Sequence, residues 1–247
     1  MMIQDRLGGD HMTNRVEDFV DSIDRRVADI AAACTACGAC ANVCPTIDVA
    51  GVDKSDPEAL TAGVRDILRG READDGSQAW AKACCGSGAC LTVCEHGINP
   101  RFMLTMARRA MVQDQAIAQR RADGKAAFQK MSRGVRVLSR LSLPPALHEK
   151  LSPRSHPECD EVPDLVFYTG CNMLKTPHIG LLCLDVLDRL GVTYEVLGGP
   201  SACCGILQTR PGDTENAGRQ AFNTLDKMAA SKTSEAVSYT QLTLPTI

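Results

Sequence analysis

The spacing of apolar residues predicts helices in the first half of the chain. Between residues 15 and 33 apolar side chains recur every three or four positions, which places them on one face of a helix. This face consists of Val16, Phe19, Val20, Ile23, Val27 and Ile30. Two further helices are expected to begin at Asp56-Pro57 and at Asn99-Pro100, where a capping side chain precedes proline, and Gly70 is expected to end the first of these.

Towards the end of the chain the pattern changes to alternating strands and helices. Residues 165–168 and 193–197 have the composition of buried strands, whereas residues 177–190 and 213–230 have helical spacing. This order predicts a right-handed parallel β-α-β-α unit at residues 164–236. The intervening residues 118–163 mix basic and small residues with proline-rich breaks, so we interpret them as a linker.

Candidate chemistry lies first in a run of four cysteines. Cys34, Cys37, Cys40 and Cys44 follow the spacing C-x-x-C-x-x-C-x-x-x-C, and Pro45 comes next. Bacterial ferredoxins bind [4Fe-4S] clusters with this run, and its fourth cysteine ligates the neighbouring cluster where two are present. The spacing therefore predicts one complete [4Fe-4S] site and the presence of a second cluster.

A second run supplies the candidate for that second cluster. Cys84, Cys90 and Cys94 align with the first, third and fourth cysteines of the first run, but Ser87 occupies the second position. Because a hydroxyl replaces a soft thiolate there, the site is expected to hold either a [3Fe-4S] centre or a [4Fe-4S] cluster completed by Cys85 or by a Ser87 alkoxide. Cys85 on its own is interpreted as a spare small residue.

Composition agrees with an intracellular metalloprotein. The 247 residues are 44% hydrophobic, carry a net charge of −3 and include thirteen cysteines, with no apolar stretch long enough to cross a bilayer. The charge argues against nucleic acid as a partner, and so many cysteines without an export signal predict a reducing compartment. Structural zinc usually needs two C-x-x-C pairs with a longer insert, and disulfides between such close cysteines would be strained. Both alternatives are less favoured than iron-sulfur.

Three more cysteines follow the predicted strands. Cys171 comes after the first strand, and Cys203-Cys204-Gly205 come after the second. Parallel sheets place ligands at the carboxyl ends of their strands, so these thiols are expected to lie together. Cys159 and Cys183 have no partner at ligand spacing and are interpreted as structural or incidental. The single histidines receive no role, and Arg101, Arg108 and Arg109 are interpreted as a solvated helix face.

Together the two runs and the CCG motif resemble the heterodisulfide reductase-like family of iron-sulfur proteins. This family includes the iron-sulfur subunits of glycolate oxidase, anaerobic glycerol-3-phosphate dehydrogenase, lactate-utilisation complexes and dimethylglycine demethylase. The resemblance implies a mainly α fold with an α/β part: an α-helical dicluster ferredoxin domain at residues 15–117 and the first half of a βαβ cysteine-rich (CCG) domain at residues 164–236. It also implies ligand sets for three sites. The first set is Cys34, Cys37, Cys40 and Cys94, the second is Cys84, Cys90 and Cys44, and the third is the incomplete CCG set Cys171, Cys203 and Cys204.

The two ends of the chain carry separate expectations. Residues 1–14 are polar and are interpreted as a disordered leader. The family pattern continues with a further C-x-x-C near position 240, but residues 237–247 instead resemble a translated sequencing adapter. We therefore expect a truncated fragment whose native sequence ends near Ala236.

The expected function is electron transfer within an oxidoreductase complex. The resemblance implies a flavin dehydrogenase subunit as electron donor, a quinone or redox protein as acceptor, and a cytoplasmic location in which a partner makes any membrane contact. No catalytic acid, base or nucleophile motif is found in the chain. The alternative is a catalytic subunit that reduces a disulfide at the CCG domain, as heterodisulfide reductase does.

Overall fold

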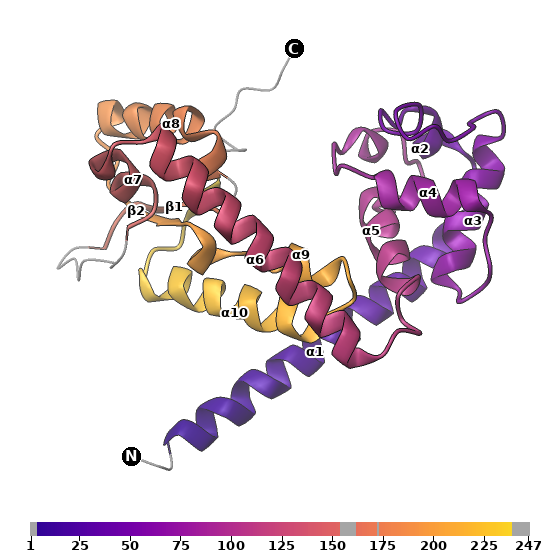
Figure 1. Cartoon of the computed structure of the whole chain (residues 1–247), viewed down its shortest axis with the longest axis horizontal. Coiled ribbons are helices and arrows are strands. Elements are labelled where there is room, and N and C mark those ends of the chain that lie inside the picture. Colours follow the sequence, from indigo (N-terminus) through magenta and orange to yellow (C-terminus); the bar gives the residue numbers. More distant parts are fainter. Residues whose placement is uncertain (1–3, 154–161, 172, 239–247) are drawn as a thin grey trace. The chain divides into compact units, whose positions relative to one another are not determined.

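The computed structural model describes residues 4–153, 162–171 and 173–238, which form two compact units. One unit comprises Met1–Gly124 with Gln208–Glu215, and the other comprises Lys125–Leu207 with Asn216–Ile247. Figure 1 shows a helical first part and a second part that contains the sheet. The division after Gly124 falls inside the segment interpreted as a linker.

The first unit is built from helices joined by short loops. Its elements are α1 (Gln4–Ala33), α2 (Ala39–Asn42), α3 (Pro57–Leu68), α4 (Asp75–Ala83), the 3-10 turn η1 (Ala89–Leu91) and α5 (Pro100–Ala110). The predicted caps are confirmed: a carboxylate oxygen of Asp56 accepts the Ala59 N–H at 2.8 Å, and the side-chain oxygen of Asn99 accepts the Phe102 N–H at 2.9 Å. Helix α4 was not predicted, although Asp74 caps it by accepting the Ser77 N–H.

The expected leader is wrong for residues 4–14, which continue helix α1 towards the amino terminus. No proline interrupts this segment, and extending an existing helix fixes only one residue for each new hydrogen bond. The predicted apolar face of residues 15–33 is confirmed, because Val16, Ile23 and Ile30 are buried.

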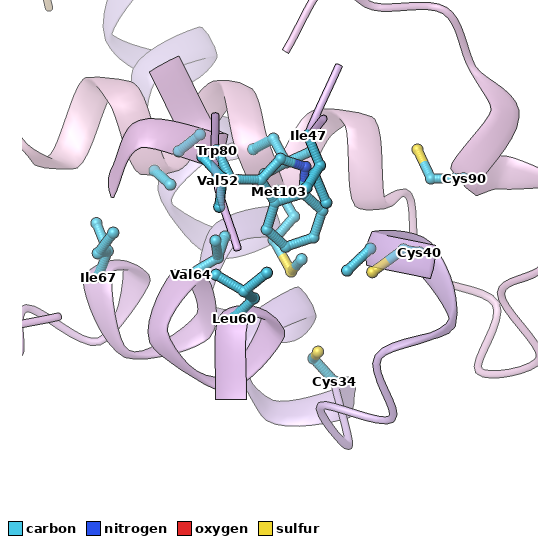
Figure 2. Close-up of a cluster of buried hydrophobic side chains, with 14 of the residues drawn as sticks. Cys34, Cys40, Ile47, Val52, Leu60, Val64, Ile67, Trp80, Cys90 and Met103 are labelled. Atoms are coloured by element: carbon cyan, nitrogen blue, oxygen red, sulfur yellow. The ribbon is translucent and has the colours of Figure 1, made fainter. Parts of the chain in front are cut away.

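Helices α3, α4 and α5 pack against one another around an apolar core. Trp80 lies in this core with Ile47, Val64 and Met103, and none of these four side chains is exposed to solvent. Figure 2 shows the same core with the sulfurs of three cysteines at its edge. The core therefore fixes the backbone from which the cysteine loops project.

The second unit contains a three-stranded parallel sheet in the order β2-β1-β3. Its strands are β1 (Leu165–Gly170), β2 (Tyr194–Gly198) and β3 (Ala236–Ser238), and its main helices are α8 (Pro177–Leu190) and α10 (Thr214–Ala230). The short elements are η2 (Met173–Lys175), η3 (Pro200–Ala202) and α9 (Ile206–Thr209). The predicted parallel pairing is confirmed, and Gly191 ends α8 in the left-handed conformation, as expected.

The linker interpretation is wrong for most of residues 118–163. Helix α6 (Ile117–Ser142) and helix α7 (Pro145–Leu151) occupy much of the segment. Many of its basic and small residues favour helix. Val135 and Ser139 are buried four positions apart on α6, and the buried Leu151 of α7 packs in the apolar core beside the sheet. The proline breaks after Ser142 separate two helices rather than marking an irregular linker.

Two expectations fall partly or wholly outside the described residues. Cys159 lies in the undescribed segment 154–161, and residues 239–247 of the proposed adapter tail are likewise not described. Val237 and Ser238 pair with Phe167 and Tyr168 in the sheet. Whether residues 237–247 are native therefore stays a prediction.

Candidate metal centres

The first cysteine run forms a tight loop between α1 and α2. Cys34 extends the end of α1 through an N–H bond to the Ile30 carbonyl, and Cys40 lies in α2. Between them, Ala36 and Gly38 have positive φ angles of 60° and 75°, which turns the chain sharply on either side of Cys37. The loop therefore directs three thiols from a seven-residue stretch towards one region.

The second run repeats this backbone. Gly86 and Gly88 have positive φ angles of 81° and 85°, and η1 follows Gly88 as α2 follows Gly38. Ser87 lies between them, in the position that Cys37 has in the first loop. The serine thus places a hydroxyl where the first loop has a thiol, within the same local geometry and without a shift of the loop.

One cavity is lined by Cys34, Cys37, Cys40 and Cys94. Three of these thiols come from the first run, whereas Cys94 comes from the end of the second. Cys34 and Cys40 are buried, and Cys37 is exposed. This is the set of four that the family resemblance assigned to one cluster.

A second cavity is lined by Cys44, Cys84, Cys85, Ser87 and Cys90. Here the first run contributes its fourth cysteine, so each run sends one thiol to the site of the other. Cys85 and Ser87 both line this cavity, which keeps both options open for its fourth ligand. The structure thus brings together the second predicted set as well.

Burial and neighbouring groups give the thiols different acidities. Burial raises the pKa of Cys40 to about 11, and the nearby Cys34, Cys90 and Cys37 add to this effect. Burial and the charge of Cys84 also raise the pKa of Cys90.

Cys44 differs from these thiols in its hydrogen bonds. Burial acts to raise its pKa, but bonds from Thr46, Trp80 and Ile47 outweigh it, so the pKa is lowered. The indole Nε1–H of Trp80 donates to Cys44 Sγ at 3.2 Å, and Thr46 Oγ1 lies 3.3 Å from the same sulfur. These hydrogen bonds therefore stabilise the anionic form of Cys44.

Several residues near these cavities were missed or misinterpreted from the sequence. His96 received no role, but it lines the first cavity and its Nε2 lies 2.8 Å from Thr35 Oγ1. Arg108 is not on a solvated face: it donates to the carbonyls of Ala81, Lys82 and, at 2.7 Å, Cys84. These contacts complete the carboxyl end of α4 and hold the start of the second cysteine loop.

The solvated-face interpretation is also wrong for Arg109. Its side chain is 11% exposed, and its guanidinium pairs with Asp24 on α1 at 2.6 Å. Arg101, by contrast, lines the second cavity and lowers the pKa of Cys90 through its charge, against the larger effect of burial. The sequence pattern did not separate these three arginines, because all three occur on the same predicted helix.

The three CCG cysteines lie together in the second unit. Cys171 directly follows β1, and the Sγ atoms of Cys171 and Cys203 are 4.0 Å apart. Cys203 is buried and Cys204 is exposed. The expectation that the strand ends would bring these thiols together is therefore confirmed for this pair.

Local contacts fix this corner of the sheet. The hydroxyl of Tyr168 donates to the Ala202 carbonyl at 2.9 Å, and burial followed by the three cysteine charges raises its pKa. Gly205 has a φ of 81°, and a Cβ there would lie 2.4 Å from the Ala217 carbonyl oxygen. The glycine of the motif is thus required by close packing of the loop on α10.

Cys183 is buried in the apolar core beside the sheet, where desolvation raises its pKa. This placement agrees with the structural role expected from its isolated position in the sequence.

The donor sets fit iron-sulfur clusters. Thiolates are the usual ligands of such clusters, and each cavity is bordered by at least three cysteines from both runs. Among the described residues, no three His, Cys, Asp or Glu side chains converge closely enough to bind a single metal ion. Also within the described part of the chain, no helix has the length and apolarity needed to span a membrane.

Comparison with known proteins supports the same assignment. Residues 18–98 match the family model of a 4Fe-4S dicluster domain, and residues 165–240 match that of a cysteine-rich domain. The glycolate oxidase iron-sulfur subunit of Escherichia coli is 23% identical over 209 residues, covering 78% of this chain and 51% of that protein.

A second relative is one of the subunits of the dihydromethanophenazine:CoB--CoM heterodisulfide reductase of Methanosarcina acetivorans. It is 25% identical over 205 residues, covering 72% of this chain and 46% of that protein. The chain thus spans about half the length of these curated relatives, and no solved structure matches it. The chain therefore matches a 4Fe-4S dicluster domain and, after it, a cysteine-rich domain, and it is similar to iron-sulfur and heterodisulfide reductase subunits of known oxidoreductases.

Proposed function

We propose that this chain is the electron-transfer component of an oxidoreductase complex and that it holds two iron-sulfur clusters in its helical domain. The observation that carries the proposal is the exchange of cysteines between the two runs. Cys94 lines the cavity of the first run, and Cys44 lines the cavity of the second. Shared ligand runs of this kind hold two clusters close together, as electron transfer requires.

The first cluster is proposed to be [4Fe-4S], bound by Cys34, Cys37, Cys40 and Cys94. The second is proposed to use Cys44, Cys84 and Cys90, with Ser87 or Cys85 completing a [4Fe-4S] cluster or with a [3Fe-4S] centre in its place. An iron-sulfur cluster supplies one-electron chemistry, and the chain supplies the thiol ligands, their burial and their hydrogen bonds.

Electrons are proposed to come from a flavin-dependent dehydrogenase subunit and to leave for a quinone or another redox protein. The names of both relatives describe subunits of larger oxidoreductases, which supports a role inside a complex. The thirteen cysteines favour a reducing, cytoplasmic location, with any contact at the inner face of a membrane made through a partner.

Electron transfer is tested with the full chain after anaerobic reconstitution with iron and sulfide. Photoreduced flavin serves as the donor and a water-soluble quinone analogue as the acceptor, while the visible cluster absorbance is followed. The expected result is bleaching by the flavin and recovery of the absorbance when quinone is added. A colourless protein that binds zinc would contradict the proposal and support a zinc-binding module.

The second candidate function is disulfide reduction at the CCG domain. It is favoured by the 4.0 Å approach of the Cys171 and Cys203 sulfurs and by the similarity to a component of a heterodisulfide reductase. In the same assay a small organic disulfide replaces the quinone. Recovery of absorbance with the disulfide but not with the quinone, together with release of two thiols per two electrons, would select this function.

The iron content of the second centre is tested separately by EPR. A [3Fe-4S] centre has a signal in the oxidised protein, and this signal should disappear in Ser87→Cys as a fourth thiolate completes the cluster. Cys85→Ala serves as the matched control, because Cys85 lines the same cavity two residues away. Loss of cluster iron in Cys85→Ala but no change in Ser87→Cys would instead assign Cys85 as the fourth ligand.

A further inference from the structure

The surroundings of Cys44 distinguish the second cavity from the first. Trp80 is fully buried among Ile47, Val52 and Met103, as Figure 2 shows. The only polar group of its indole is the N–H, which can donate a hydrogen bond but cannot accept one. An unpaired N–H in such a core would be costly, and Cys44 Sγ at 3.2 Å is the partner that satisfies it. The packing of the ring therefore holds the N–H on this sulfur.

The corresponding contact in the first cavity is different in kind. Cys40 Sγ lies 3.8 Å from Thr61 Oγ1, but the Thr61 hydroxyl already donates to the Pro57 carbonyl at 2.8 Å. A hydroxyl has a single proton, so donation from Thr61 to the Cys40 sulfur competes with its shorter bond to the Pro57 carbonyl. In the second cavity both the indole N–H and the Thr46 hydroxyl can donate to Cys44.

Hydrogen bonds to cluster sulfurs are among the features that set the reduction potential of iron-sulfur centres. Reduction adds one electron and no new bond, so the negative charge shared by the cluster and its thiolates increases. A donor that points at one of these thiolates stabilises the reduced form more than the oxidised form. The effect is stronger in a buried site because the surrounding dielectric constant is low.

We propose that Trp80 is a positioning residue of the second centre, and that its N–H bond to Cys44 raises the reduction potential of that centre without affecting the first. The proposal rests on the proposed function, since it requires a cluster bound by Cys44, Cys84 and Cys90. It assigns to the sole tryptophan of the chain a role that neither cysteine motif indicates.

The test is a redox titration of the reconstituted full chain, with dithionite as reductant and EPR detection of each centre. Cys84→Ala, which removes a thiol of the second cavity alone, assigns the signals. In Trp80→Phe a smaller aromatic ring remains and the N–H is lost. We expect about a tenfold lower ratio of reduced to oxidised second centre at the wild-type midpoint, which corresponds to about 59 mV for one electron. The first centre should be unchanged.

Two further proteins make the result decisive. Because Trp80 is the only tryptophan, growth with benzothienylalanine in place of tryptophan removes the N–H while keeping the bicyclic shape, and it decides the question if Trp80→Phe does not fold. Ser77→Ala is the matched control. It removes a buried hydroxyl on the same helix, which lies 2.6 Å from Asp74 Oδ2 and 3.1 Å from the Leu60 carbonyl oxygen, and it should shift neither centre.

An unchanged second midpoint without the indole N–H would overturn the proposal, as would an equal shift in Ser77→Ala. Failure of the wild-type chain to assemble any iron-sulfur cluster would overturn the proposed function as well. The two failures are therefore distinguishable in one set of samples.

Discussion

Replacement of Gly38 by alanine should destabilise the helical domain more than the equivalent replacement of Gly88. Both glycines have left-handed φ angles, 75° and 85°, and both precede the short helix of a cysteine loop. A Cβ at Gly38 would lie 2.9 Å from the Pro57 carbonyl carbon and 3.0 Å from the Glu58 nitrogen. A Cβ at Gly88 would meet Leu91 Cδ1 at 3.6 Å, an ordinary contact.

The magnitudes follow from these contacts. The left-handed conformation costs alanine about 1–2 kcal/mol at either position. At Gly38 the backbone of α3 must also move, and overpacking of this kind costs about 1–3 kcal/mol more. With a urea m-value of about 1–3 kcal/mol per molar, the midpoint for Gly38→Ala should lie about 1 M below that for Gly88→Ala.

Trp80 fluorescence is a suitable probe, because the only tryptophan of the chain lies in the core of this domain. Anaerobic urea titrations of wild type and both variants give the midpoints, and iron per chain gives the retention of the clusters. Equal midpoints for the two variants would refute the inferred backbone contact between the first cysteine loop and α3.

Three further predictions concern other parts of the fold. Leu184→Ala, in the core of the second unit, should lower the free energy of unfolding by about 2–5 kcal/mol, as measured by circular dichroism in urea. Leu182→Ala, at an exposed position of the same helix, should change it by less than about 0.5 kcal/mol. Arg108→Ala should lower the free energy of unfolding by about 2 kcal/mol, and Arg108→Lys should restore little of it, because one guanidinium donates to three carbonyls. Urea midpoints are read by tryptophan fluorescence, and full stability of the lysine variant would contradict this reasoning. The backbone and hydroxyl bonds from Thr193 lower the pKa of the Asp164 carboxyl. Its contribution to stability should therefore be complete above the ordinary aspartate pKa of about 3.9 and be lost as the pH falls through the lowered value. The stability difference between wild type and Asp164→Ala should shrink from pH 6 to pH 3, and a constant difference would refute this.

Local signals in the sequence were sufficient for the two helices in which a capping residue is followed by proline. Asp56-Pro57 and Asn99-Pro100 mark the starts of α3 and α5, because capping and proline at the first helical position depend on adjacent residues. The parallel pairing of β1 and β2 also followed, because it depends on the order of the elements. The two sets of cavity-lining cysteines matched the family pattern, which encodes the exchange of Cys44 and Cys94.

Long-range packing explains what the sequence pattern did not show. Apolar periodicity did not reveal helix α6, because two of its buried positions, Ser132 and Ser139, are polar. The segment was therefore interpreted as a linker. The bond from Trp80 to Cys44 joins residues 36 positions apart, and no spacing rule relates an indole to a thiol. The different environments of Arg101 and Arg108 likewise depend on which neighbouring loop each side chain reaches.

We propose that the two cysteine runs together hold two redox-active iron-sulfur centres. The most direct measurement is iron, sulfide and EPR spin quantitation of the anaerobically reconstituted chain and of the variant in which Cys34, Cys37 and Cys40 are all alanine. We predict two one-electron centres in the wild type and loss of the first centre, with its iron and its EPR signal, in the variant. Equal iron content and equal electron uptake in the two proteins would show that these cysteines do not bind a redox-active cluster.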